Sequence, residues 1–247
     1  MHRTSFLACL LAASAISSRG TAQITEIIDQ TGDRAGNSLS SAVGVAVDSG
    51  GNAYVTGLFS NNAFEITPGG SITEIIDRTG DGAGNALIFP FGIAVDSGGN
   101  AYVTGLGSSN AFKITPGGII TKIIDRTGDG AGNGLLGPAG IAVDSGGNIY
   151  VTGEESSNAF KITPGGIITK IIDQAGDGAG NTLNVAEGIA VDSSGNVYVT
   201  GGGSSNVLTY VPEPSLVLGL GSCVPMLGFL ARFRRGRGGQ TEHTGAG

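Results

Sequence analysis

An eleven-residue stretch rich in oxygen-bearing side chains recurs along this chain of 247 residues. It reads IIDRTGDGAGN at 75–85 and at 123–133, and close variants occupy 27–37 and 171–181. Oxygen ligands from Asp, Thr and Asn at a spacing of two and four residues suit calcium. The copies supply eight candidate cation- or ligand-binding residues: Asp29, Asp33, Asp77, Asp81, Asp125, Asp129, Asp173 and Asp177.

The twelfth position of this loop separates it from an EF-hand. Counted from Asp77 it is Ile88, and the later copies place Leu136 and Asn184 there, so the bidentate Glu that closes an EF-hand site is missing. Two interpretations stay open. The loop is either a weaker calcium site or a glycine-rich crossover that the fold itself requires, and we expect no other cofactor.

The same spacing of 48 residues runs through the middle of the chain. The Asp residues of the AVDSGGN segments and the Asn residues four positions later both recur at it. The copies at 92–133 and 140–181 differ at five positions. Such self-similarity indicates a repeat architecture.

A complete repeat contains four short runs rich in β-branched residues, separated by turn-forming Gly, Pro, Ser and Asn. In one repeat they read GIAVD, NAYVTG, NAFKIT and IITKIID. Four antiparallel strands per 48 residues are typical of a propeller blade. The sequence therefore predicts an all-β fold, a β-propeller of four four-stranded blades over residues 23–211.

The two ends of the array differ. The run Ile24–Asp29 matches the fourth strand of a repeat, whereas the last repeat stops after its third run at 206–211. We expect the N-terminal strand to complete the last blade, which closes the ring and leaves no exposed sheet edge. The alternative is an open arc that is completed by a second chain.

The segments GIAVDSGGNAYVTG and GIAVDSSGNVYVTG resemble NHL and bacterial SBBP-type propeller repeats, which pair a Gly-Ile-Ala-Val-Asp strand with an Asn-x-Tyr-Val strand. The resemblance covers nearly all of residues 24–211. It implies the propeller fold and leaves the function open, because propellers carry many unrelated activities.

Enzymatic chemistry has little support in this region. The segment KITPGGIITKI resembles repeats of virginiamycin B lyases, whose chemistry relies on a histidine, but His2 and His243 both lie outside the repeats. We expect a non-enzyme, with a carboxylate-metal hydrolase or lyase as the alternative. The Asp of each AVDSGGN segment is interpreted as a turn residue, and the repeated Tyr residues as packing between blades.

Charge and cysteine content exclude further classes. Residues 23–211 carry 18 Asp and Glu against 7 Lys and Arg, which argues against nucleic acid as a partner. Cys9 and Cys223 both lie outside the repeats, so the repeats hold neither a disulfide nor a cysteine metal site.

Both termini resemble targeting elements. Residues 1–22 combine Arg3, an apolar run and small residues before position 23, the pattern of a secretory signal peptide. Residues 212–237 resemble the PEP-CTERM sorting signal of Gram-negative bacteria. Its parts are the tripeptide Pro212, Glu213 and Pro214, an apolar membrane segment at 215–231, and an Arg cluster with Arg232, Arg234 and Arg235. Residues 238–247 are expected to be a disordered tail.

That resemblance implies an exosortase-like processing enzyme as partner and a link to exopolysaccharide. We therefore expect an exported protein of a Gram-negative bacterium, held at the cell envelope or outer surface by a C-terminal membrane helix, or secreted. Its propeller would serve as a binding or structural module. The repeated acidic loops and the loops between second and third strands should share one face, where a polysaccharide or surface protein would bind.

Overall fold

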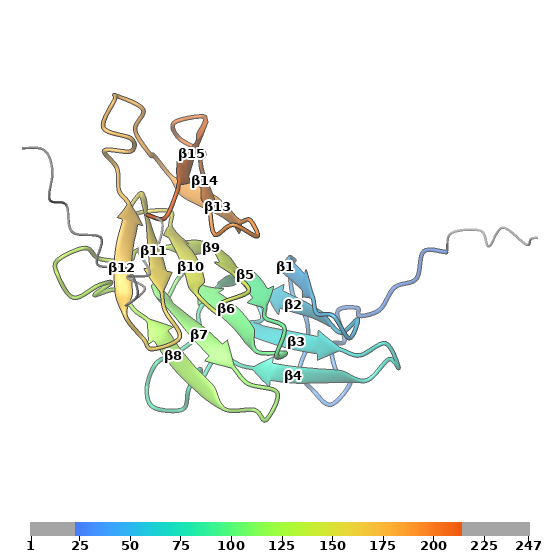
Figure 1. Cartoon of the computed structure of the whole chain (residues 1–247). Helices are drawn as coiled ribbons and strands as arrows, with labels where there is room; N and C mark the ends of the chain where they lie inside the picture. The colour runs from blue at the N-terminus through green and yellow to red at the C-terminus, as the bar shows by residue number, and fades with distance from the viewer. Residues whose placement is uncertain (1–22, 214–247) are drawn as a thin grey trace, which may run out of the picture. The chain divides into compact units, whose positions relative to one another are not determined.

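The computed structural model describes residues 23–213, which form an all-β array of fifteen strands in four antiparallel sheets (Figure 1). The predicted repeat of blade-like sheets is confirmed. The predicted signal peptide, the apolar segment at 215–231 and the C-terminal tail lie outside the described residues. Within residues 23–213 no helix is long and apolar enough to cross a membrane.

Each sheet is one blade, with its strands in chain order. Blade 1 consists of β1 (Ala42–Val47), β2 (Ala53–Gly57), β3 (Asn62–Ile66) and β4 (Ile72–Ile76). Blade 2 consists of β5 (Pro90–Val95), β6 (Ala101–Gly105), β7 (Asn110–Ile114) and β8 (Ile120–Ile124). Blade 3 consists of β9 (Pro138–Val143), β10 (Ile149–Gly153), β11 (Asn158–Ile162) and β12 (Ile168–Ile172). Blade 4 consists of β13 (Ala186–Val191), β14 (Val197–Gly201) and β15 (Asn206–Tyr210).

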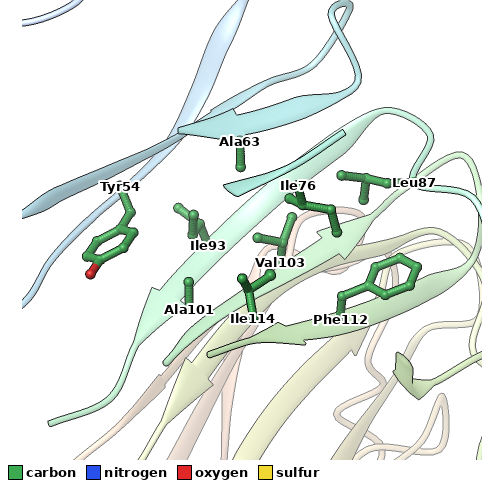
Figure 2. Close-up of a cluster of buried hydrophobic side chains, with 9 residues drawn as sticks. All are labelled: Tyr54, Ala63, Ile76, Leu87, Ile93, Ala101, Val103, Phe112 and Ile114. Atoms are coloured by element: carbon green, nitrogen blue, oxygen red, sulfur yellow. The ribbon is translucent and has the colours of Figure 1, made fainter. Parts of the chain in front are cut away.

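The hydrophobic core lies between successive blades rather than inside one. Figure 2 shows the first of these layers, in which blade 1 contributes Tyr54, Ala63 and Ile76. Blade 2 and the loop before it contribute Leu87, Ile93, Ala101, Val103, Phe112 and Ile114. Equivalent clusters join blade 2 to blade 3 and blade 3 to blade 4. Each blade is therefore stabilised mainly by its neighbours, as expected of a repeat protein.

A buried threonine hydroxyl links each blade to the next through hydrogen bonds. The Thr104 Oγ1 accepts the Gly92 N–H of its own blade at 2.8 Å and donates to the Ala139 carbonyl of blade 3 at 2.9 Å. The register of β5 and β6 shifts around Gly92, because its N–H turns from the strand ladder to this hydroxyl. Thr56 and Thr152 make the same pair of contacts in their blades.

Glycine is required beside each of these hydroxyls because the blades approach closely there. A Cβ atom at Gly92 would lie 2.3 Å from the Ala139 oxygen, and one at Gly140 would lie 2.4 Å from the Glu187 oxygen. Any larger residue would push the innermost strands apart. The Gly and Thr of the GIAVD and YVTG runs thus act as one inter-blade contact.

The predicted closure of the last blade by Ile24–Asp29 is wrong in this structure. These residues form no strand, Ile24 is fully exposed, and the fourth sheet has three strands. The physical reason is distance: β1 contacts β5, β5 contacts β9 and β9 contacts β13, but no comparable contact joins β13 to β1. A strand can pair only with an edge roughly 5 Å away. The described array is therefore open.

The threonine contact predicts a specific stability loss. Thr104→Val should lower the free energy of unfolding by about 2 kcal/mol, because it leaves the partly buried Gly92 N–H and the buried Ala139 carbonyl without their shared partner. Thr104→Ser keeps the hydroxyl and should cost roughly half as much or less. Urea denaturation of both variants compares the two, and equal losses would contradict the account.

Candidate binding face

Two kinds of loop meet at one end of the blades, which we call the crossover face. They are the crossovers that carry the repeated acidic stretch and the loops between second and third strands. The Asn110 Nδ2 donates to the Ala86 carbonyl at 2.9 Å, and the Ser108 Oγ accepts the Ile88 N–H at 3.1 Å. Asn62, Asn158 and Asn206 make the equivalent bonds in the other blades. The expected shared face therefore exists.

The second acidic residue of each crossover shapes the loop around itself. The Asp81 Oδ1 accepts the N–H groups of Ala83 and Asn85 at 2.9 and 3.3 Å, and its Oδ2 accepts the Asn85 Nδ2 at 2.7 Å. Asp33, Asp129 and Asp177 have the same partners in their loops. These carboxylates act as turn-forming acceptors.

The first acidic residue of each crossover accepts hydrogen bonds from the residue two positions on. In the second copy the Asp77 Oδ1 accepts the Thr79 N–H at 2.8 Å and its hydroxyl at 2.6 Å. Asp29, Asp125 and Asp173 also accept the N–H of the residue two positions later. All eight predicted site residues therefore lie in preformed turns on one face, distributed over four separate loops.

Two lysines neutralise part of this acidic face. The Lys122 Nζ lies 2.7 Å from the Asp125 Oδ2, and the Lys170 Nζ lies 2.9 Å from the Asp173 Oδ2. The Lys122 ammonium beside Asp125, together with hydrogen bonds from Thr127, lowers the pKa of that carboxyl to about 2. These pairs were not predicted from the sequence, although both lysines occupy the repeat position at which Glu74 stands in blade 1.

Glu74 makes the blade 1 end of the face different. Its carboxylate accepts a 2.8 Å hydrogen bond from the Asn62 amide. Burial raises the pKa of Glu74 and outweighs that bond, and the nearby charges of Asp77 and Asp33 raise it further. Blade 1 therefore carries a carboxylate, Glu74, at the position where blades 2 and 3 carry the lysines Lys122 and Lys170.

The geometry does not gather these acids into a metal centre. Among residues 23–213, no three Asp, Glu, His or Cys side chains come close enough together to hold an ion. Calcium binding by the loops stays a prediction.

A pair of exposed phenylalanines lies on the same face at the junction of blades 1 and 2. Phe59 and Phe89 meet edge to face with ring centroids 6.2 Å apart. Phe89 has a φ of 50°, and its N–H is held by the Asn61 Oδ1 at 2.9 Å. The equivalent positions in the next junction are Gly107 and Gly137. This departure from the repeat is the sequence signal that could have identified the pair.

The crossover face is hollowed further along the array. A groove of about 440 Å³ is lined by residues of the crossovers on either side of blade 3 and by its second loop: Asn133, Ser156, Asn158, Lys170 and Asp173 among them. Its walls offer hydroxyl, amide and charged groups. Such a surface suits a hydrophilic ligand.

The opposite end of the blades has a structural role. The Asp96 carboxylate accepts the Gly98 and Asn100 N–H groups at 2.9 Å each and the Tyr102 hydroxyl at 2.8 Å. Burial raises the pKa of Tyr102, whose ring packs against blade 3. The interpretation of the AVDSGGN aspartates as turn residues is confirmed. So is the packing of the repeated tyrosines between blades, except at Tyr198, which has no following blade.

Comparison with known proteins supports the repeat type. Residues 79–113, 130–159 and 171–208 match the family model described as SBBP, Beta-propeller repeat. These three segments are therefore similar to SBBP-type propeller repeats. No curated protein matches the chain.

Several solved structures share the fold at low sequence identity. The streptogramin B lyase structure has a TM-score of 0.54 and 18% identity over 70% of this chain and 55% of its own. A chain of the nidogen/laminin complex has a TM-score of 0.55 and 21% identity over 69% and 60%. An auxiliary nutrient binding protein from Bacteroides ovatus ATCC 8483 has a TM-score of 0.53 and 19% identity over 72% and 49%. The aligned part of this chain spans about half the length of these proteins.

The lowered pKa values of the turn carboxylates predict that the fold loses stability in acid. The pKa of Asp33 is held below its ordinary value first by the Ala35 N–H, and that of Asp125 is about 2. A depressed folded pKa stabilises the fold above the unfolded value of about 3.9, and this stabilisation disappears as pH falls through the folded value. The melting temperature should therefore change little from pH 7 to 5 and fall between pH 4 and 2.

Lys122→Met tests the cause of that loss. The variant should be less stable by about 0.5 kcal/mol at pH 7, the scale of a partly exposed ion pair. Its deficit should shrink towards pH 2, where Asp125 becomes protonated in both proteins. The same substitution at exposed Arg78 is the control and should show no such convergence. A deficit that is constant with pH would contradict the assignment.

Proposed function

We propose that this chain is an exported protein of the cell surface or extracellular matrix whose propeller repeats bind a polysaccharide or a surface protein through the crossover face. The observation that carries the proposal is the repetition of rigid, hydrogen-bonded loops with acidic and amide side chains on that one face. Loops preorganised in this way lose little conformational entropy when a ligand binds.

The character of the face favours a carbohydrate. Asn, Ser and carboxylate groups suit the hydroxyl groups of sugars. The exposed Phe59 and Phe89 rings supply an apolar surface against which the C–H faces of a sugar ring can stack. Each loop offers a modest contact, and repetition along the array raises the overall affinity for a repeating polymer.

Structural neighbours support a binding role without specifying it. One forms part of a nidogen/laminin complex, and another is an auxiliary nutrient binding protein. Both use the same fold, and at these identities the likeness concerns the fold alone.

A carboxylate-metal hydrolase or lyase is the alternative, since another neighbour is a lyase. The acids of the described face argue against it, because their oxygens already serve the backbone turns and Lys122 and Lys170. A catalytic centre needs different groups that converge on one point. Here the acids are distributed over equivalent loops.

The proposed location rests on the termini. Residues 1–22 would direct export, and an exosortase-like enzyme would process the signal that begins at Pro212 and Glu213. The membrane segment at 215–231 would hold the unprocessed protein. Intact mass measurement of the protein from its native host tests this directly, with a mature chain that begins at Gln23 expected and an unprocessed Met1 terminus contradicting export.

A glycan array of bacterial polysaccharides tests the binding function. The full chain should bind neutral polymers on the array. Phe59→Ala should lower its affinity for the best-bound polymer roughly fivefold, since one aromatic contact contributes about 1 kcal/mol. Ile119→Ala removes an equally exposed apolar side chain from the opposite end of blade 2 and should have no effect.

Calorimetric titration with calcium chloride accompanies the array. If calcium occupies the crossover loops, Asp81→Asn should reduce the binding heat. The proposal would be contradicted if the full chain bound no polymer at all. It would also be contradicted if Phe59→Ala left glycan binding unchanged and Asp81→Asn left calcium binding unchanged.

A further inference from the structure

The last blade presents a face that the other blades bury. Tyr198 is 41% exposed, whereas its equivalents Tyr102 and Tyr150 are 2% and 1% exposed. Val207 is 62% exposed, whereas Ala111 at the same repeat position is fully buried. These side chains lie where blades 1–3 each receive a following blade.

The first blade presents part of the complementary face. Val45 is 70% exposed, whereas its equivalent Ile93 is 7% exposed because blade 1 covers it. Val47 is also exposed, although its equivalent Val95 packs against the first inter-blade cluster. The array therefore ends in two apolar surfaces that the repeat itself makes complementary.

The polar contact between blades is also half-formed at the open end. The Thr200 Oγ1 accepts the Gly188 N–H at 2.8 Å, as in the other blades. Thr56, Thr104 and Thr152 each donate in addition to a carbonyl 35 residues later, the first of them to Phe91 at 2.9 Å. The position 48 residues before Phe91 is Val43. The Val43 carbonyl of a first blade is thus the acceptor that Thr200 is placed to meet.

Gly188 leaves room for that approach. A Cβ at Gly140 would lie 2.4 Å from a carbonyl of the next blade, but a Cβ at Gly188 would meet only the Thr200 side chain of its own blade. The sequence carries the small residue that close blade contact requires, at a place where no blade follows.

The edge of the last sheet lacks one strand, and a segment with the sequence of that strand lies unpaired at the other end. β15 pairs with β14 alone, and a groove of about 560 Å³ runs along it. Residues 24–28 read ITEII, identical to β4. Ile28 packs on Leu39, Val55, Phe64 and Ile66. Its repeat equivalent Ile76 packs in the same cluster as Leu87, Val103, Phe112 and Ile114.

The N-terminal segment is therefore held against blade 1 in the position that the fourth strand of a preceding blade would take. The crossover after it has the same turn as the later ones, with the Gly32 N–H donating to the Asp29 carbonyl at 3.0 Å and the Gly80 N–H to the Asp77 carbonyl at 3.1 Å. Whatever blade docks on blade 1 can receive this segment as its fourth strand.

We propose that this blade is blade 4 of a second copy of the chain. In the complex, blade 1 of one copy covers the exposed side of its partner's blade 4, which carries Tyr198 and Val207. Residues 24–28 of the first copy pair with β15 of the partner. The register of β3 with β4 predicts the pairs Val207 with Ile28, Leu208 with Glu26, Thr209 with Thr25 and Tyr210 with Ile24. The reciprocal contact closes the dimer, which removes both open edges.

Two observations favour a second copy over the same chain as occupant. Blades 4 and 1 of one chain have no contact comparable to that between successive blades. The array also superposes on propellers of which it covers 55%, 60% and 49%. Each of these chains thus extends well beyond the part that the array matches.

Sedimentation equilibrium of the full chain in mild detergent tests the proposal, with Cys9 and Cys223 replaced by Ser. A dimer is expected. Gly188→Ala should weaken it at least tenfold, because the added methyl group would meet the Val43 carbonyl of the partner copy. Gly69→Ala, where a Cβ would make only an ordinary contact of 3.8 Å with the Thr67 Oγ1, is the control and should leave the dimer unchanged. A monomer at all concentrations, or equal effects of the two variants, would overturn the proposal.

Mixing two defective variants tests the head-to-tail geometry. Gly188→Ala damages the blade 4 face and Val45→Asp the blade 1 face, so each alone loses both contacts of the closed dimer. A mixture of the two retains one intact contact and should recover association. If each variant melts at the wild-type temperature and the mixture still fails to associate, this geometry is contradicted.

A cysteine pair at Ile24 and Tyr210 identifies the chain that supplies the strand. Oxidation should yield covalent dimers on a denaturing gel, since directly opposed cross-strand residues lie about 5 Å apart. A bridge within one chain would show closure by its own N-terminus and overturn the proposal, as would the absence of any bridge.

Discussion

The array depends on one repeated contact, the threonine hydroxyl that joins a glycine N–H of its own blade to a carbonyl of the next. Thr104 shows it in full, with bonds of 2.8 and 2.9 Å, and its side chain is fully buried. The adjoining glycine lets the innermost strands approach. Because each blade contributes one half of each contact, the same geometry sets the packing and leaves both ends of the array incomplete.

The crossover face follows from this arrangement. Blades held in a fixed relation place their crossovers side by side, and the turn aspartates then fix each loop by hydrogen bonds to its own backbone. The main role of these carboxylates is therefore to accept hydrogen bonds that hold the loops in place. Departures from the repeat, such as Phe59 and Phe89 or the exchange of Glu74 for Lys122, give the face its local character.

Much of this was predictable from the sequence. The period of 48 residues and the four β-branched runs predict the blades, and the turn role of Asp96 follows from its Gly and Asn neighbours. The closure of the last blade was not predictable. The sequence ITEII specifies a strand, but it does not specify which sheet edge lies within reach. The Lys122–Asp125 pair was missed because it depends on side-chain reach between positions three residues apart.

Hydrogen exchange of β15, followed by mass spectrometry at low and high protein concentration, tests the central claim that the array is open within one chain and completed by another. The account predicts that residues 206–210 exchange faster than β7 and β11 in dilute protein and become equally protected in concentrated protein. Equal protection at the lowest concentration, or fast exchange at every concentration, would contradict it.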